Sequence, residues 1–175
     1  MVFQNTLITI KRSERIQKLM KLNDLISPQR VLSGLKGKSK KRILEKASEF
    51  ISQESGFETY KIYNGLIERE RLGSTGIGFG VAIPHCRLSD LKIEDARGYL
   101  IQLERKIDFD SLDKLPVELL FVLLLPEHTS QFHLDLLSNL AHFFSKGNVR
   151  DKMKLTSSSA ELYGVAQRTF NSVLK

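Results

Sequence analysis

The chain has 175 residues, a formal net charge of +7 and a single cysteine, Cys86, which together describe one compact domain without an internal disulfide. Its longest apolar stretch, residues 115–125, is interrupted and falls short of the roughly 20 apolar residues that a membrane helix needs, and the N-terminus carries no recognisable export signal. We therefore expect a cytoplasmic protein that is not inserted in a membrane.

Much of the positive charge lies outside the expected core. Residues 11–21 and residues 36–42 each contain five lysines and arginines and no aromatic side chain. Nucleic-acid binding usually combines such clusters with a recognised fold or with aromatic stacking, so no nucleic-acid partner is expected. The alternative, a nucleic-acid-binding protein that uses these basic clusters, predicts affinity that depends strongly on salt. We expect residues 1–19 to be a disordered basic extension and residues 20–175 to be the folded domain.

The first expected elements are a turn, a strand and two helices. Ser27-Pro28 matches the cap and first position of a short turn, and residues 31–35 predict an edge strand. From Ser39 onward the apolar residues have the spacing of a helix that buries one face; they are Ile43, Leu44, Ala47, Phe50 and Ile51. A second helix is expected over residues 58–71, ending at Gly73.

A glycine-dense stretch, residues 73–80, leads into Val81-Ala82-Ile83-Pro84-His85. Because proline has no N–H for a sheet ladder, the strand should end or lie at an edge at Pro84. His85 is then expected at a strand end, exposed to a crevice.

The second half of the chain alternates strands and helices. Residues 98–103 and 117–125 are apolar enough to be strands covered on both faces. A helix is expected over residues 130–145, stopped by Gly147, and a capping box at residues 158–161 begins the last helix. This order predicts an α/β fold, a single domain with a mixed β-sheet of about five strands flanked by helices.

His85 is the candidate for reactive chemistry. A neutral imidazole is a competent nucleophile near pH 7, because its ordinary pKa is about 6.5. Phosphoryl transfer to it needs mainly positioning and charge neutralisation. The neighbouring glycines let a ligand approach the backbone amides, and the hydroxyls of Ser74 and Thr75 add polar contacts. From these residues alone, a purely structural histidine is an equal alternative.

The other histidines have different settings. His133 lies four residues before Leu137 on the apolar stripe of its helix, so it should point inward. Its helix follows directly on the strand 117–125, which places His133 at the same sheet end as His85, where open α/β sheets bind ligands. A structural role is the alternative. His142 is off the stripe and should be solvated, and His128 is expected in a loop.

Other catalytic interpretations are weaker. The glycine run reads G-x-G-x-G, which matches neither the dinucleotide fingerprint nor a P-loop. Because there is no HExxH and no CxxC pair, we expect no metal and no cofactor. Cys86 is a poor partner for His85, since neighbouring residues on a strand point to opposite faces.

The segment from Arg69 to His85, RERLGSTGIGFGVAIPH, resembles the signature of the type 2 IIA domains (mannitol/fructose type) of the phosphoenolpyruvate-dependent phosphotransferase system. The resemblance extends from about Met20 to Phe170 and is strongest to the nitrogen-regulatory IIA branch. It implies a mannitol-type IIA fold for residues 20–175.

The resemblance also implies roles for individual residues. His85 matches the histidine that accepts the phosphoryl group, at its tele nitrogen. Arg69 matches an arginine that offsets phosphate charge, and His133 matches a second histidine that contacts the phosphoryl group without carrying it. Ser74 and Thr75 are expected phosphate contacts, although each can equally be a turn residue.

The family implies a phosphocarrier more than a self-contained enzyme. Its phosphate comes from a small histidine phosphocarrier protein, which enzyme I loads from phosphoenolpyruvate. We expect regulation of a partner protein by phosphorylation state, because the resemblance is to the nitrogen branch and the chain carries no fused IIB or IIC segment. The alternative is a IIA component of a fructose/mannitol-type permease that passes phosphate to a IIB domain.

Two residues depart from the family pattern. Family members usually have glycine at the position of Cys86 and often asparagine at that of Phe79. A bulkier residue after the nucleophile is expected to affect donor docking more than phosphorylation.

Overall fold

The computed structural model describes residues 22–88, 96–127 and 131–173. The expected extension 1–19 and His128 lie outside these ranges. In chain order the elements are α2 (Leu22–Leu25), the 3-10 turn η1 (Pro28–Arg30), β1 (Val31–Leu35), α3 (Lys40–Ser55), α4 (Thr59–Arg71), β2 (Gly76–Gly78), β3 (Val81–Ala82), β4 (His85–Arg87), β5 (Arg97–Ile107), β6 (Val117–Leu125), α5 (Gln131–Ser145), α6 (Gly147–Lys154) and α7 (Ser159–Val173).

Within the described ranges the sheet is mixed and has six strands, in the order β1-β5-β6-β3-β2 with β4 also paired to β6. β5 and β6 are antiparallel, whereas β1 runs parallel to β5, and β3 and β4 run parallel to β6. The mixed α/β fold is confirmed. Strands β2 and β4 were not located from the sequence, and β4 is separate from β3 because Ile83 and Pro84 lie between them.

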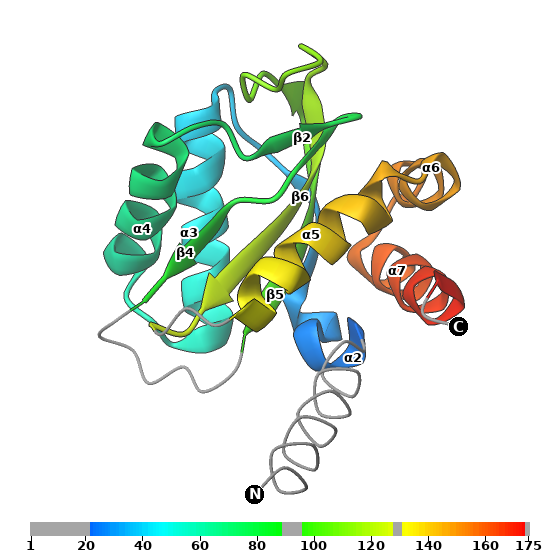
Figure 1. Ribbon diagram of the computed structural model, residues 1–175, viewed down its shortest axis with the longest axis horizontal. Coiled ribbons are helices and arrows are strands. Elements are labelled where there is room, and N and C mark those ends of the chain that lie inside the picture. Colours follow the sequence, from blue (N-terminus) through cyan, green and yellow to red (C-terminus); the bar gives the residue numbers. More distant parts are fainter. Residues whose placement is uncertain (1–21, 89–95, 128–130, 174–175) are drawn as a thin grey trace, which may run out of the picture.

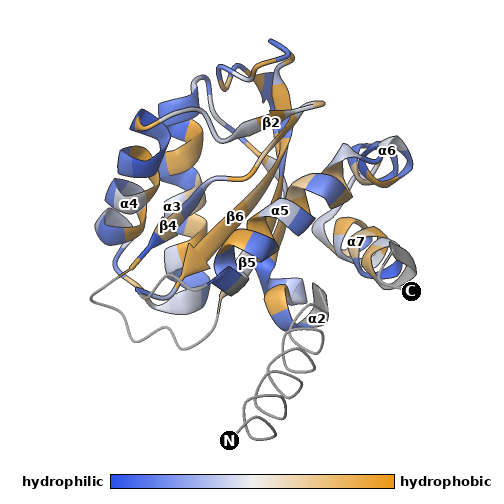
Figure 2. Cartoon of the chain, viewed as in Figure 1, coloured by the Kyte–Doolittle hydropathy of each residue, from blue (hydrophilic) through white to orange (hydrophobic). Residues whose placement is uncertain are grey.

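Helices cover both faces of the sheet. Helices α3 and α4 lie on one face, and α5, α6 and α7 lie on the other (Figure 1). Strand β6 is apolar from Leu119 to Leu125, and most of the strand has the colour of hydrophobic residues in Figure 2. Leu119, Phe121 and Leu123 pack toward α5 and α7, and Leu120 and Val122 pack toward α3 and α4. This alternation explains why the strand is apolar at every position after Glu118.

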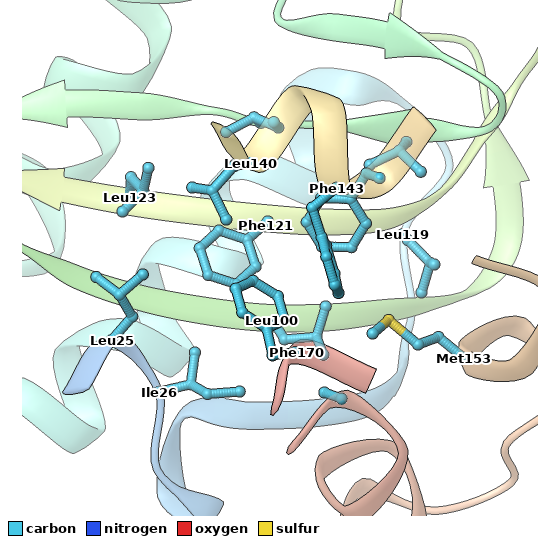
Figure 3. Close-up of a cluster of buried hydrophobic side chains, with 14 of the residues drawn as sticks. Leu25, Ile26, Leu100, Leu119, Phe121, Leu123, Leu140, Phe143, Met153 and Phe170 are labelled. Carbon is cyan, nitrogen blue, oxygen red and sulfur yellow. The ribbon is translucent and has the colours of Figure 1, made fainter. Parts of the chain in front are cut away.

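The core on the α5 side is rich in aromatic rings (Figure 3). The Phe121 ring lies 5.7 Å from that of Phe144, and the Phe143 ring lies 3.8 Å from that of Phe170. Leu140 packs in the same cluster. These contacts join α5 and α7 to the sheet.

Side chains satisfy backbone groups at the start of α3 and at the end of α5. The Ser39 hydroxyl accepts a hydrogen bond from the backbone N–H of Arg42 and caps α3. Helix α5 ends at Ser145, but Gly147 begins a further helix, α6, which the sequence did not predict. Arg150 from α6 donates to the carbonyls of Phe144 and Ser145, so a side chain satisfies the end of α5.

Among the described residues, none of the helices combines the length and apolarity needed to cross a bilayer.

Candidate active site

His85 is the first residue of the short strand β4, where it pairs with Leu123 of β6. Pro84 interrupts the strand before it, and the Pro84 carbonyl accepts from the N–H of Leu123 at 2.9 Å. His85 therefore lies after a break in the strand, near the carboxyl end of β6. Helix α4 packs against β4, and the start of α5 contributes to the same site from the other side (Figure 1).

Both ring nitrogens of His85 have partners. Nδ1 lies 2.8 Å from the carbonyl oxygen of Ile83, and Nε2 lies 2.9 Å from Nε of Arg69. A carbonyl oxygen can only accept, and an arginine Nε–H can only donate. This pair of contacts selects the neutral tautomer with the proton on Nδ1 and the lone pair on Nε2.

The surroundings keep the ring neutral. Burial lowers the pKa of His85 below its ordinary value, and the charges of Arg69 and Arg87 lower it further, although the hydrogen bond to Ile83 opposes these effects. A lowered pKa leaves the imidazole unprotonated at neutral pH. The Nε2 lone pair is thus available as a nucleophile.

Arg69 is positioned by the last turn of α4. One of its terminal nitrogens donates to the carbonyl oxygen of Gly73 at 3.0 Å, while Nε reaches His85. This bond ties the Arg69 side chain to the backbone just beyond the end of α4. The guanidinium is therefore held beside the nitrogen that carries the lone pair.

His133 enters the site from the first turn of α5. Its side chain is buried, and it lines the same cleft as Arg69 and His85. Burial lowers the pKa of His133, and the charge of Arg87 lowers it further. The three residues that the sequence placed together therefore do converge, from α4, β4 and α5.

The cleft that these residues line has a volume of about 640 Å³. Its rim also carries the apolar side chains of Leu72 and Leu134, which are 85% and 52% exposed. Large exposed leucines beside a polar centre are typical of a surface that another protein covers. Among the described residues, no three histidine, cysteine, aspartate or glutamate side chains are grouped as metal ligands.

A family model described as "Phosphoenolpyruvate-dependent sugar phosphotransferase system, EIIA 2" matches residues 24–168. The chain belongs to this EIIA 2 family. Its relatives include the nitrogen regulatory protein of Pseudomonas aeruginosa, which is 39% identical over 148 residues, 84% of this chain and 95% of the relative.

Solved structures of EIIA proteins share the fold. The crystal structure of nitrogen regulatory protein IIA-Ntr from Neisseria meningitidis has a TM-score of 0.75 and 35% identity, covering 83% of this chain and 98% of that one. Enzyme IIA-Mtl from Escherichia coli, solved in complex with phosphorylated enzyme IIB-Mtl, has a TM-score of 0.66 over 81% of this chain and 96% of that one. At 16% identity the latter shows the fold alone.

Ser74 and Thr75 of the EIIA signature do not line the cleft. The Ser74 hydroxyl donates to the carbonyl of Phe109, and the Thr75 hydroxyl donates to the buried carboxylate of Glu70 at 2.6 Å. A direct contact with a phosphoryl group on His85 would require both hydroxyls to leave these partners. In the structure they have the turn-stabilising role that the sequence left open.

Thr75 is nevertheless connected to the site. Glu70 accepts from the N–H of Thr75 and pairs with Lys40 at 3.2 Å. The carbonyl of Thr75 accepts from the N–H of Ile83 at 2.9 Å, and the carbonyl of Ile83 holds Nδ1 of His85. The signature turn therefore positions the histidine ring through the backbone.

The two residues that depart from the EIIA pattern have different settings in the structure. Cys86 is buried, and a Cβ on Gly65 of α4 would lie only 2.9 Å from its Cβ. Its thiol has a pKa raised to about 12 by burial, which makes it a poor nucleophile. Phe79 has a φ of 59°, in the left-handed region that asparagine tolerates better than phenylalanine.

Arg87 is a site residue that sequence reasoning missed. It lines the cleft and its charge acts on both histidines. Arg87 lies two residues after His85 on an extended segment, which puts both side chains on the same face. This spacing was the signal that could have identified it.

Proposed function

We propose that this chain is a phosphocarrier of the nitrogen branch of the phosphotransferase system, acting in the cytoplasm. It accepts a phosphoryl group on Nε2 of His85 from a histidine phosphocarrier protein, and its phosphorylation state regulates a partner protein. The observation that carries this proposal is the pairing at His85, where Nδ1 is held by Ile83 and Nε2 lies 2.9 Å from a guanidinium.

The transfer exchanges one N–P bond for another. The Nε2 lone pair attacks the phosphorus of the donor's phosphohistidine, the N–P bond of the donor breaks, and the electron pair returns to the donor's imidazole. As the phosphorus arrives, Arg69 exchanges its contact with Nε2 for a phosphoryl oxygen. The transition state carries charge on its equatorial oxygens, which a guanidinium neutralises through charge-assisted hydrogen bonds.

His133 contacts the phosphoryl group without receiving it. Its burial at the start of α5 and its place in the cleft support this role. A neutral imidazole donates from one ring nitrogen only, so His133 can orient an oxygen without adding a second nucleophile in the attacking position. We expect its removal to affect onward transfer more than the first transfer.

The names of the relatives favour a role in regulation over a role in sugar transport. Those that match most of the chain are named nitrogen regulatory proteins. Phosphorylation adds about two negative charges to a cleft rimmed by arginines and exposed leucines, which changes its complementarity to a partner. A IIA component that passes phosphate to a IIB domain is the second candidate, favoured by the complex of IIA-Mtl with phosphorylated IIB-Mtl.

The test is labelling by a reconstituted relay of phosphoenolpyruvate, enzyme I and the small phosphocarrier, followed by intact mass and acid treatment. We expect one acid-labile, alkali-stable adduct that is lost in His85→Ala. His142→Ala is the matched control, because His142 is exposed and lies outside the cleft. An adduct that persists in His85→Ala would disprove the proposal.

The same assay tests the role of the second histidine, His133. In His133→Ala the adduct should still form, but discharge to a downstream acceptor, such as a IIB domain, should be slower than in the unchanged protein. Equal discharge rates would remove His133 from the mechanism.

A further inference from the structure

Arg87 lies two residues beyond His85 on β4. In a strand, side chains two positions apart point to the same face, and roughly 6.6 Å of backbone separates their Cα atoms. Cys86, between them, points to the opposite face and packs against Gly65. Both His85 and Arg87 line the cleft. The Arg87 side chain is therefore long enough for its guanidinium to reach a group bound to His85.

Arg87 has no competing structural role in the described part of the chain. Its side chain is exposed, and no described residue is hydrogen-bonded to it or forms an ion pair with it. Most other arginines near the sheet are engaged, for example Arg30 with Glu54 and Arg150 with the end of α5. An unpaired guanidinium in a cleft is available for an anion.

The charge of Arg87 reaches both histidines. It lowers the pKa of His85 and also that of His133, whereas Arg69 acts on His85. Arg87 and the two histidine rings line one cleft, into which a phosphoryl group on Nε2 would extend.

The charge on a phosphoryl group is shared by three oxygens. Arg69 and His133 account for two donors, from α4 and α5. Arg87 on β4 supplies a third donor and a second positive charge, so that each donor comes from a different element.

We infer that Arg87 is a further catalytic residue, whose guanidinium binds an oxygen of the phosphoryl group while it is transferred to, and carried on, His85. This inference rests on the proposed phosphorylation of His85. Arg87 would stabilise both the transition state and the phosphorylated form, without exchanging a proton.

A small phosphoryl donor separates this role from a docking role. Phosphoramidate transfers its phosphoryl group to an imidazole when its N–P bond breaks, the Nε2–P bond forms and ammonia leaves. It has no protein surface, so its reaction with His85 reports contacts to the phosphoryl group alone. The same variants are then labelled by the protein donor.

We expect Arg87→Gln to slow labelling by phosphoramidate by about tenfold or more, the loss that removing one charge-assisted hydrogen bond produces. Arg87→Lys, which keeps the charge, should recover part of the rate. Arg105→Gln is the matched control, since it removes the same charge from a separate groove. The thermal unfolding midpoint of each variant checks the fold.

If phosphoramidate labelled Arg87→Gln at the same rate as the unchanged protein, the inference would be overturned. If only labelling by the protein donor slowed, Arg87 would be a docking residue. Failure of both donors to label His85 in the unchanged protein would instead disprove the proposed function, so the two failures are distinguishable.

Discussion

The imidazole of His85 is held at both nitrogens, by the carbonyl of Ile83 and by the guanidinium of Arg69. The first contact fixes the proton on Nδ1, and the second brings a permanent positive charge to the lone pair. Each has a chemical consequence, because a phosphoryl acceptor must be neutral before transfer and needs a cation beside it afterwards.

Removal of the Arg69 guanidinium has two expected effects. In Arg69→Gln the pKa of His85 should rise toward its ordinary value, because one of the charges that lower it is lost. The labelling rate should fall by about tenfold or more, since a charge-assisted hydrogen bond contributes about 1.5–3 kcal/mol. An NMR pH titration of the imidazole and a relay time course measure these effects.

The direction in which the labelling rate changes with pH follows from the protonation state of the nucleophile, His85. Only the unprotonated ring reacts, so labelling falls as pH drops through the pKa of His85, and a raised pKa moves this fall to higher pH. Arg105→Gln, in a separate groove, should leave the midpoint unchanged. A midpoint in Arg69→Gln equal to that of the unchanged protein would argue against a direct charge effect.

At the scale of elements, the site depends on how closely α4 approaches β4. A Cβ at Gly65 would lie 2.9 Å from Cβ of Cys86 and 3.1 Å from its Sγ. The glycine therefore accommodates the side chain that distinguishes this chain from the family pattern. Since Arg69 lies one helical turn beyond Gly65, the spacing of α4 and β4 also sets the distance from Arg69 to His85.

A double-mutant cycle tests this packing. Gly65→Ala should lower the free energy of unfolding by about 1–3 kcal/mol through overpacking, even though alanine favours a helix over glycine by about 1 kcal/mol. In a Cys86→Gly background the obstruction is absent, so the same change should be neutral or stabilising. Urea denaturation gives both values; an equal cost in both backgrounds would contradict the packing account.

Periodicity predicted most of the elements. The spacing of Ile43, Leu44 and Ala47 predicted a helix from Ser39 onward, where α3 lies, and the largely apolar run 117–125 predicted β6 with its exact bounds. Helix α6 was missed because Gly147, which usually ends a helix, begins one here. Its stabilising contacts come from Arg150 to the end of α5, and sequence spacing does not encode such tertiary contacts.

At the scale of the whole molecule, the site is assembled from α4, β4 and α5, which lie on or between the two layers of helices (Figure 1). Sequence order predicted that His85 and His133 would share a sheet end, because a helix follows directly on β6. It could not predict that Ser74 and Thr75 turn away, since their partners Phe109 and Glu70 are brought to them by the tertiary fold.

The overall charge is distributed in keeping with a protein partner. In the second basic cluster, Lys36 pairs with Glu104, Lys40 with Glu70 and Asp110, and Arg42 with Glu45. Intramolecular pairing of this kind reduces the field available to a nucleic-acid backbone. The cleft at His85 instead combines arginines with exposed leucines, a composition suited to contact with another protein.

The central claim is that the fold presents Nε2 of His85, and no other nitrogen, to an incoming phosphorus. The most direct measurement is NMR of the phosphorylated protein with 15N-labelled histidine, in which coupling to 31P identifies the bonded nitrogen. We predict coupling to Nε2 of His85, with Nδ1 still protonated and hydrogen-bonded to Ile83. Coupling to Nδ1, or to a nitrogen of any other histidine, would contradict it.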